Sequence, residues 1–282
     1  MAGMVPTPAD SPVQVFAHRG DSGPHPEMTR AAFASAIEIA RTRGVRLGLE
    51  CDVHFTADGQ LGCLHDKSLA RTGRDADGNP VDQALDELTV AQLKEVDFGS
   101  WRTDLTDARE LTAAEREFMT LADLLELVAQ AREDGLDIGI AIETKHPVSR
   151  DDDVEAAVAA LLRERGWTGA DSGIRMITFR ADAVARMDEL LPELPQSFLF
   201  SKEQVWQDLQ SGDIEVKAHH ALGVDGRLLL SNPGLVAEIR ATGRECHVWT
   251  ANESADIKAL QALGVEAITS DFPDRVFDAV AG

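Results

Sequence analysis

The sequence has few cysteines, no long apolar run and no long basic stretch, and each shortage excludes a class of protein. The three cysteines (Cys51, Cys63 and Cys246) include no CxxC pair. This odd number and spacing disfavour a disulfide framework or a zinc knuckle, and predict buried free thiols. No stretch approaches the roughly 18 apolar residues of a membrane span. The first 20 residues lack a basic region and a continuous apolar segment, so we expect no signal peptide and a cytoplasmic location.

Negative charge dominates the composition: 49 Asp and Glu face 27 Lys and Arg, for a formal net charge of -22. This charge repels nucleic acid and anionic lipid, so we expect no nucleic-acid partner and no stable membrane association. It leaves a small-molecule partner open, because a bound metal can reverse the local sign inside a cleft. It does not set the oligomeric state. The 44% hydrophobic and 27% charged residues are ordinary for a globular protein.

Short β-rich stretches alternate with longer helical patterns along nearly the whole chain. Apolar residues at three-to-four spacing indicate helices at 29–44, 120–135, 152–166 and 232–243. Strand followed by helix, repeated, predicts a parallel sheet, and eight such units favour a closed TIM (β/α)8 barrel. The eight predicted barrel strands are 13–17, 46–53, 138–143, 174–179, 196–200, 214–220, 245–250 and 266–270.

One segment interrupts this alternation. Residues 54–118 separate the second and third predicted strands and contain turns and a short helical pattern at 89–96. The segment is too long for an ordinary βα loop, and loops of this length are usually functional. We therefore predict one domain, 1–282, with the insertion 54–118 over the mouth of the barrel.

Carboxylates stand at the ends of two predicted strands. Glu50 and Asp52 are two residues apart on an apolar strand, so both must point to the same face of the sheet. Leu47, Leu49 and Val53 argue against the alternative that they project into solvent. Two like charges removed from water need a shared cation, and Glu143, at the end of the third strand, supplies a third oxygen ligand. Such a set indicates Mg²⁺ or Ca²⁺ rather than zinc, without deciding between the two ions.

Two histidines and two cations follow strands near these carboxylates. His18 and Arg19 come directly after the first strand, Lys145 lies two positions after Glu143, and His65 lies just beyond the second strand. Two histidines near their ordinary pKa suit a general acid and a general base at neutral pH. The alternative for His18 is a hydrogen bond to a neighbouring loop, and for His65 a buried structural role.

Seven short motifs occur in an order that resembles the glycerophosphodiester phosphodiesterase family. They are AHRG at 17–20, PEMT at 26–29, LECDVH at 49–54, LHD at 64–66, IETK at 142–145, HVWTANE at 247–253 and ITSDFPD at 268–274. The stretch LTVAQLKEVDFGSW, within the irregular segment, also resembles the family's insertion. The resemblance thus runs nearly end to end.

The resemblance implies a TIM barrel whose divalent cation is held by Glu50, Asp52 and Glu143. It implies that His18 and His65 form the acid–base pair, and that Arg19 and Lys145 hold phosphate oxygens. It places Glu27 in or beside the substrate-binding set, and it packs Trp249 against glycerol, although a core position is the commoner one for a lone tryptophan. The implied reaction cleaves a small-molecule glycerophosphodiester to glycerol 3-phosphate and an alcohol.

The chain departs from the family's pattern in three places, none of which is a proposed ligand or histidine. Met28 stands where the family has Asn, and Thr29 is expected to cap the following helix in its place. Residues 178–180 and the approach to Asp271 also differ. Activity is still expected, whereas the three departures leave the headgroup preference open. One alternative is a phospholipase D-like enzyme acting on lysophospholipid or sphingolipid, which would need an apolar patch beside the mouth. Another is a non-catalytic phosphate-binding barrel.

Overall fold

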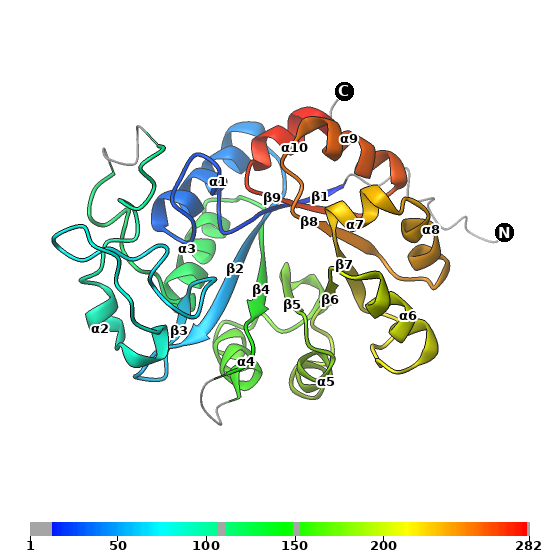
Figure 1. The fold of residues 1–282 in the computed structure, drawn as a ribbon, viewed down its shortest axis with the longest axis horizontal. Helices are drawn as coiled ribbons and strands as arrows, with labels where there is room; N and C mark the ends of the chain where they lie inside the picture. The colour runs from blue at the N-terminus through cyan, green and yellow to red at the C-terminus, as the bar shows by residue number, and fades with distance from the viewer. Residues whose placement is uncertain (1–12, 106–110, 149–152, 281–282) are drawn as a thin grey trace.

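The barrel is closed by pairing of the first strand with the last. The computed structural model describes residues 13–105, 111–148 and 153–280 (Figure 1). Strand β1 pairs in parallel with both β2 and β9, and every other neighbouring pair around the barrel is also parallel. The TIM barrel prediction is therefore confirmed. The eight barrel strands are β1 Gln14–Ala17, β2 Leu47–Phe55, β4 Ile138–Thr144, β5 Ile174–Thr178, β6 Gln196–Phe200, β7 Ala221–Asp225, β8 Cys246–Trp249 and β9 Ala267–Ser270.

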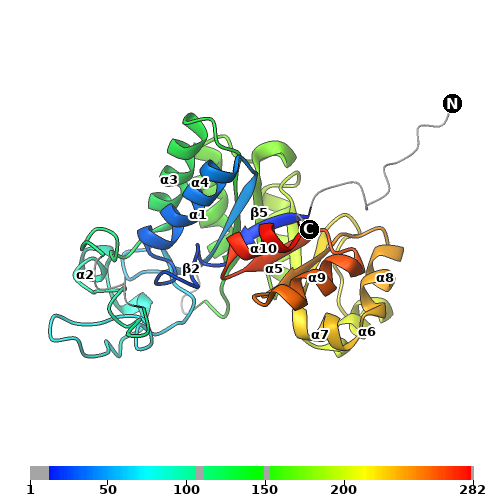
Figure 2. The same ribbon diagram turned by 90° about the horizontal axis from the view of Figure 1, so that it is seen from above.

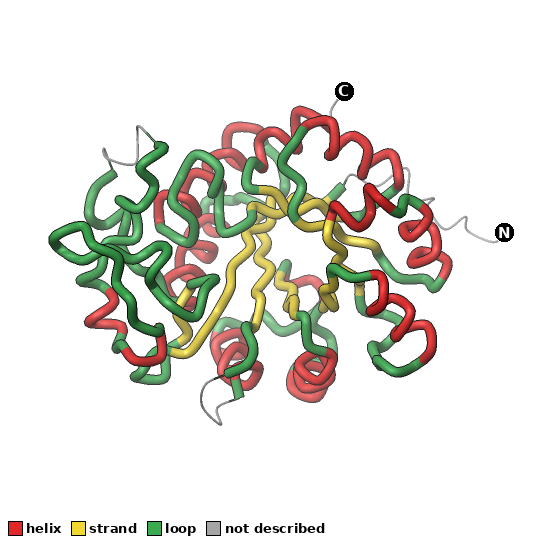
Figure 3. Tube along the Cα trace, in the orientation of Figure 1, coloured by secondary structure: helices red, strands yellow, loops and turns green. Residues whose placement is uncertain are grey.

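Helices surround the strands, as Figure 3 shows in red around yellow. The helix predicted at 29–44 begins where Thr29 accepts a hydrogen bond from the backbone N–H of Ala32, so the predicted N-cap is confirmed. The first residue of the helix predicted at 152–166 lies outside the described residues. The barrel helices are α1 Arg30–Arg43, α3 Leu121–Glu133, α4 Val154–Glu164, α5 Ala181–Leu190, α6 Glu203–Ser211, α7 Gly226–Ser231, α8 Gly234–Ala241, α9 Ser254–Leu263 and α10 Pro273–Val280.

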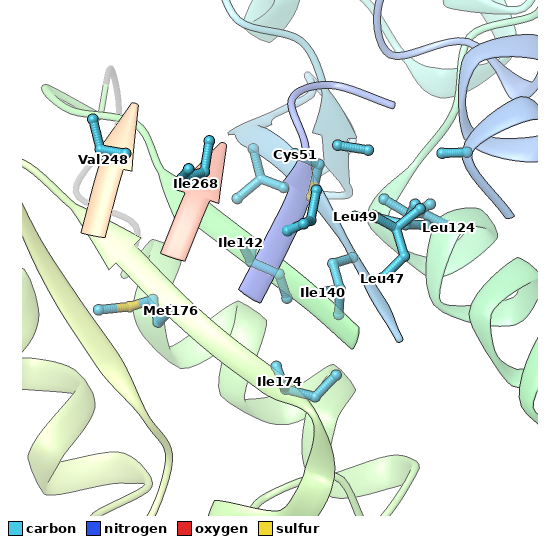
Figure 4. Close-up of a cluster of buried hydrophobic side chains, with 14 of the residues drawn as sticks. Leu47, Leu49, Cys51, Leu124, Ile140, Ile142, Ile174, Met176, Val248 and Ile268 are labelled. Carbon is cyan, nitrogen blue, oxygen red and sulfur yellow. The ribbon is translucent and has the colours of Figure 1, made fainter. Parts of the chain in front are cut away.

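The main core lies between the barrel and its helices, and it sets the direction of the polar side chains. Leu47, Leu49 and Cys51 of β2 are fully buried and face helices such as α3, which contributes Leu124 (Figure 4). Because side chains alternate along a strand, the residues between them point into the barrel. Because the apolar side chains of β2 face the surrounding helices, its carboxylates point into the barrel.

The sixth barrel strand is not where the sequence analysis puts it. The predicted strand at 214–220 is mostly exposed and contains no strand, whereas β7 begins at the next residue, Ala221. A central strand of a parallel barrel is buried on both faces, so its signal is a continuous small or apolar run rather than alternation. The segment Ala221–Asp225 has that buried pattern, and the alternation at 214–220 was misleading.

The irregular segment has a small core of its own. It leaves the carboxyl end of β2, returns as the short strand β3 (Leu61–Cys63) antiparallel to β2, and includes helix α2 (Val90–Leu93). Strand β3 was not predicted. In Figures 1 and 2 this segment lies at one side of the molecule, next to β2 and far from α6 to α8. Its core consists of Leu64, Leu69, Leu85, Leu88, Leu93, Phe98 and Phe118.

Two expectations from composition concern the cysteines and membrane-spanning helices. All three cysteines are free and buried, as predicted. Within the described ranges, no helix is long and apolar enough to cross a membrane. The expectation that there is no signal peptide concerns the first 20 residues. Of these, residues 1–12 lie outside the described residues.

Candidate active site

Three carboxylates converge inside the barrel at the carboxyl ends of β2 and β4. Asp52 and Glu143 are register partners on these neighbouring strands, and Glu50 lies two residues before Asp52 on the same face. Each offers an oxygen within 4.8 Å of the others, and all three side chains are buried. The structure therefore brings together the three predicted ligands.

The carboxylates differ strongly in their pKa values. Burial, followed by the charge of Asp52, raises the pKa of Glu143 to about 8, and the same two causes raise the pKa of Glu50 well above its ordinary value. Burial would also raise the pKa of Asp52, but Lys145 and Arg19 together lower it to about 2. Burial thus favours the neutral form of both glutamates, and a further positive charge would favour their ionised forms.

The donor set suits a hard divalent cation. Lys145 Nζ lies 2.8 Å from Asp52 Oδ1 and 2.6 Å from Glu143 Oε1, so one ammonium serves two of the three carboxylates. Asp52 Oδ2 is buried and accepts no hydrogen bond from any described residue. A buried carboxylate oxygen without a hydrogen-bond donor costs free energy that a cation would offset.

The loop after β1 is held in an unusual backbone conformation. Among the described residues, Arg19 (φ 57°) and Met28 (φ 59°) are the two residues other than glycine with positive φ. They are joined directly, because the Met28 N–H donates to the Arg19 carbonyl at 3.0 Å. Such conformations are costly and concentrate at functional sites. The Met28 side chain is buried in the main core, and so the departure from Asn places no polar side chain there.

Gly20 allows this loop to lie against α1. Its φ is 85°, and a Cβ at this position would approach the backbone carbon of Ala32 to 2.6 Å. The glycine is thus required both by the left-handed backbone and by close packing on α1. The motif AHRG places Gly20 at the start of this loop, but nothing in the local sequence indicates its contact with α1.

Arg19 links the loop to the carboxylates. Its backbone N–H donates to Glu50 Oε2 at 2.9 Å, and its side chain donates to Glu27 Oε1 at 3.0 Å. Arg19 Nε also lies 3.2 Å from Asp52 Oδ2, without an aligned hydrogen bond. Arg19 and Glu27 thus lie beside the predicted ligands, and Arg19 pairs with both Glu27 and Asp52.

His18 is oriented by a residue from the other end of the chain. Its Nδ1 lies 2.6 Å from Asp271 Oδ1, and its Nε2 lies 4.0 Å from Glu50 Oε2. Asn252 holds the other Asp271 oxygen at 2.6 Å. Burial would raise the pKa of Asp271, but the hydrogen bond with His18 and that residue's charge lower it. Since an ionised carboxylate accepts the Nδ1 proton, His18 Nε2 remains available for proton exchange beside the carboxylates.

His65 has the same arrangement on the insertion side. Its Nδ1 lies 2.7 Å from Asp66 Oδ1. Burial lowers the pKa of His65, partly opposed by the negative charge of Asp52. Burial thus disfavours the protonated ring, and among the described residues the carboxylate of Asp66 is the group that holds Nδ1. Both predicted acid–base histidines thus carry a carboxylate on Nδ1.

Trp249 stands apart from this hydrogen-bonded cluster, at the carboxyl end of β8. Its indole N–H donates to the carbonyl of Gly223 at 3.1 Å, and its ring meets Phe179 edge-to-face at 5.3 Å. Phe179 follows β5 and is 44% exposed. The two rings form an aromatic wall on the end of the barrel that also holds the carboxylates.

Sequence reasoning missed the partners of the histidines. Asp66 and Asp271 lie within the family motifs, but the sequence assigned neither a role. Arg71, which contacts Glu27 and Asp66, was not among the candidate site residues. Asp271 follows the last strand directly, and in a closed barrel that strand lies beside the first. That adjacency was the available signal for the pair with His18.

Comparison with known proteins gives a consistent family. The model of the glycerophosphoryl diester phosphodiesterase family matches residues 18–275. The chain is 32% identical over 265 residues to the probable glycerophosphodiester phosphodiesterase 1 of Mycobacterium tuberculosis, covering 93% of this chain and 90% of that protein. It is 26% identical to a glycerophosphodiester phosphodiesterase of Bacillus altitudinis, covering 93% and 96% of the two chains.

Solved structures show the same architecture. A putative glycerophosphoryl diester phosphodiesterase from Silicibacter pomeroyi superposes with a TM-score of 0.77 at 26% identity, covering 96% of this chain and 94% of that one. A phosphodiesterase from Oleispira antarctica, solved in complex with the product sn-glycerol-3-phosphate, has a TM-score of 0.76 at 25% identity, covering 95% and 97%.

Proposed function

Because the chain belongs to the glycerophosphoryl diester phosphodiesterase family, it is a phosphodiesterase, and we propose that it hydrolyses glycerophosphodiesters to glycerol 3-phosphate and an alcohol. The observation that carries the proposal is the meeting of three buried carboxylates with two histidines that each have a carboxylate on Nδ1. The product bound to the Oleispira antarctica relative supports the choice of substrate.

Glu50, Asp52 and Glu143 would hold a divalent cation, Mg²⁺ or Ca²⁺. When bound, that ion would polarise the phosphate and offset its developing charge. Arg19 and Lys145 present N–H groups in the same place and would bind phosphate oxygens, because each keeps donor capacity beyond its carboxylate partners. The short distances from the Arg19 and Lys145 side chains to Asp52 support these roles.

His18 and His65 divide the proton transfers. One removes the proton from the attacking hydroxyl, of water or of the glycerol itself, and the other protonates the alcohol oxygen as its bond to phosphorus breaks. Asp271 and Asp66 hold the rings so that Nε2 performs the exchange. Trp249 and Phe179 would contact the apolar faces of the substrate.

The exposed apolar surface favours a small diester over a lipid. Among the described residues, Phe179 is the one exposed large hydrophobic side chain. A phospholipase D-like enzyme that buries acyl chains would need a wider apolar patch beside the mouth. The retained carboxylates, cations and histidines likewise favour turnover over a non-catalytic phosphate-binding role.

Release of glycerol 3-phosphate tests the proposal directly. We expect the purified protein to release it from several glycerophosphodiesters, to lose this activity in a chelator and to regain it with Mg²⁺ or Ca²⁺. The readout is an enzyme-coupled assay for glycerol 3-phosphate. Release that is indifferent to chelator would contradict the cation requirement. Liposome binding with preferred cleavage of a lysophospholipid would favour the phospholipase D-like alternative.

Without divalent cations, the contribution of Glu143 to stability should fall as the pH rises from about 4.5 to about 8. The unfolded chain ionises Glu143 near its ordinary pKa of 4.5, whereas burial keeps it neutral in the fold up to about 8. Its contribution is therefore fully present below 4.5 and is lost as the pH rises through 8. Asp52, with a pKa of about 2, changes protonation below this window. The measurement is the melting temperature across pH in chelator.

Excess Mg²⁺ or Ca²⁺ should flatten this decline, because a cation stabilises the ionised carboxylates and binds the folded state. Glu143→Gln is the matched control, since it removes the titrating group and should reduce the slope in chelator. A melting curve with the same pH slope in chelator, in excess cation and in this variant would count against the shared site.

A further inference from the structure

Arg71, in the insertion, contacts acidic side chains from two different parts of the site. Its Nη1 and Nη2 donate to Glu27 Oε2 and Oε1, each at 2.7 Å, and its Nε donates to Asp66 Oδ2. All three guanidinium nitrogens therefore have a carboxylate acceptor. A planar guanidinium can bind two carboxylates in this way, whereas an ammonium has no comparable fork.

An aromatic ring supports the same guanidinium. Arg71 Cζ lies 5.5 Å from the centre of the Trp101 ring, and Arg102 Cζ lies 5.5 Å from the same ring. Arg102 in turn donates to the carbonyl oxygens of Ser22, Gly23 and His25 at 2.9 to 3.2 Å. The insertion is thus attached to the loop after β1, and cation–π contacts add to the restraint on Arg71.

Each acid bound by Arg71 leads to a group that the proposed reaction uses. Glu27 accepts from the side chain of Arg19, which lies 3.2 Å from Asp52. Asp66 accepts from Nδ1 of His65. Arg71 therefore joins the phosphate-binding side of the site to one of its two histidines.

We propose that Arg71 is a positioning residue, which holds His65 through Asp66 and Arg19 through Glu27. Misplacing a catalytic group by about 1 Å can cost on the order of 10²-fold in rate. Without the guanidinium each carboxylate would lose the donor to its second oxygen and would keep only its contact with Arg19 or His65, so it could rotate more freely. The inference rests on the proposed function, since it gives His65 an acid–base role.

Arg71→Met tests this role, with Arg71→Lys and Lys94→Met beside it. We expect Arg71→Met to lower kcat roughly 10- to 100-fold, and Arg71→Lys to recover part of that loss by binding one acid. Lys94 is the matched control: it is on the same insertion, 42% exposed against 39% for Arg71, and pairs with Glu117 at 3.0 Å. Lys94→Met should keep the wild-type kcat.

Two further readouts separate positioning from general stability. Adding Arg71→Met to His65→Ala should cost much less than adding it to the wild type, because residues in one hydrogen-bonded network are not additive. The rate loss in Arg71→Met should also be measured on two diesters, one with a poor alcohol leaving group and one with p-nitrophenol. The loss should change between these two substrates in the same direction as the loss in His65→Ala. A lower melting temperature with unchanged kcat, or full additivity with His65→Ala, would overturn the inference.

The same panel distinguishes failure of this inference from failure of the proposed function. If His65→Ala is inactive while Arg71→Met matches the wild type, only the role of Arg71 is refuted. If His65→Ala keeps the wild-type rate, the acid–base assignment fails, and the role of Arg71 through Asp66 fails with it.

Discussion

Replacing any one of the three buried carboxylates, by Glu50→Gln, Asp52→Asn or Glu143→Gln, is expected to lower turnover roughly 10³-fold. Cation assistance is worth several kcal/mol in the transition state, and each 1.36 kcal/mol is about tenfold in rate. The three side chains offer oxygens within 4.8 Å of one another, so each substitution removes one of the three predicted ligand oxygens. Steady-state rates and cation binding by calorimetry are the measurements.

The three variants should differ in stability although they agree in activity. Glu50→Gln and Glu143→Gln mimic the neutral forms that burial favours, so their melting temperatures in chelator should equal or exceed the wild type. Asp52→Asn should be less stable, because it leaves Lys145 and Arg19 with less compensating charge. The melting temperature of Asp52→Asn should therefore be lower than those of the glutamate variants, because of the charges in the cluster and not because of lost packing.

Another buried carboxylate, Asp225, serves as the control. Asp225 lies at the carboxyl end of β7 and pairs with Arg227 at 2.9 Å, and it belongs to neither of the strands that carry the three predicted ligands. Asp225→Asn should bind cation as the wild type does. Full chelator-sensitive activity in all three ligand variants would show that the cation, if one is bound, lies elsewhere.

His18→Ala and His65→Ala are each expected to lose about 10²- to 10⁴-fold in rate on a diester with a poor alcohol leaving group. Each ring has its Nδ1 bound to a carboxylate, so each presents one nitrogen for proton exchange. A p-nitrophenol leaving group needs little protonation. It should therefore rescue the variant that lacks the general acid far more than the variant that lacks the base, and the rescued position identifies the acid.

The exposed His219, which precedes β7 at the opposite end of the barrel, provides a matched histidine control. His219→Ala should retain the wild-type rate on both substrates. Equal losses on both substrates for both active-site variants would remove the case for divided acid and base roles, while leaving open a shared role in binding.

The sequence by itself determined the elements and the facing of the carboxylates. Local periodicity encodes these features: alternation along β2 requires Glu50 and Asp52 to share a face, and their apolar neighbours identify which face is the interior. The position of Glu143 at the end of the next parallel strand then brings it beside Asp52. The same periodicity misplaced the sixth strand, because the strand Ala221–Asp225 is buried throughout and shows no alternation.

Only the tertiary structure decided which charged groups restrain the histidines and Arg19. His18 and Asp271 are 253 residues apart and meet because β1 pairs with β9 when the barrel closes. Arg71 reaches Glu27 because the insertion folds back onto the loop after β1. No periodicity within a segment encodes such contacts, since they arise from the closure of the whole sheet and the packing of separate segments.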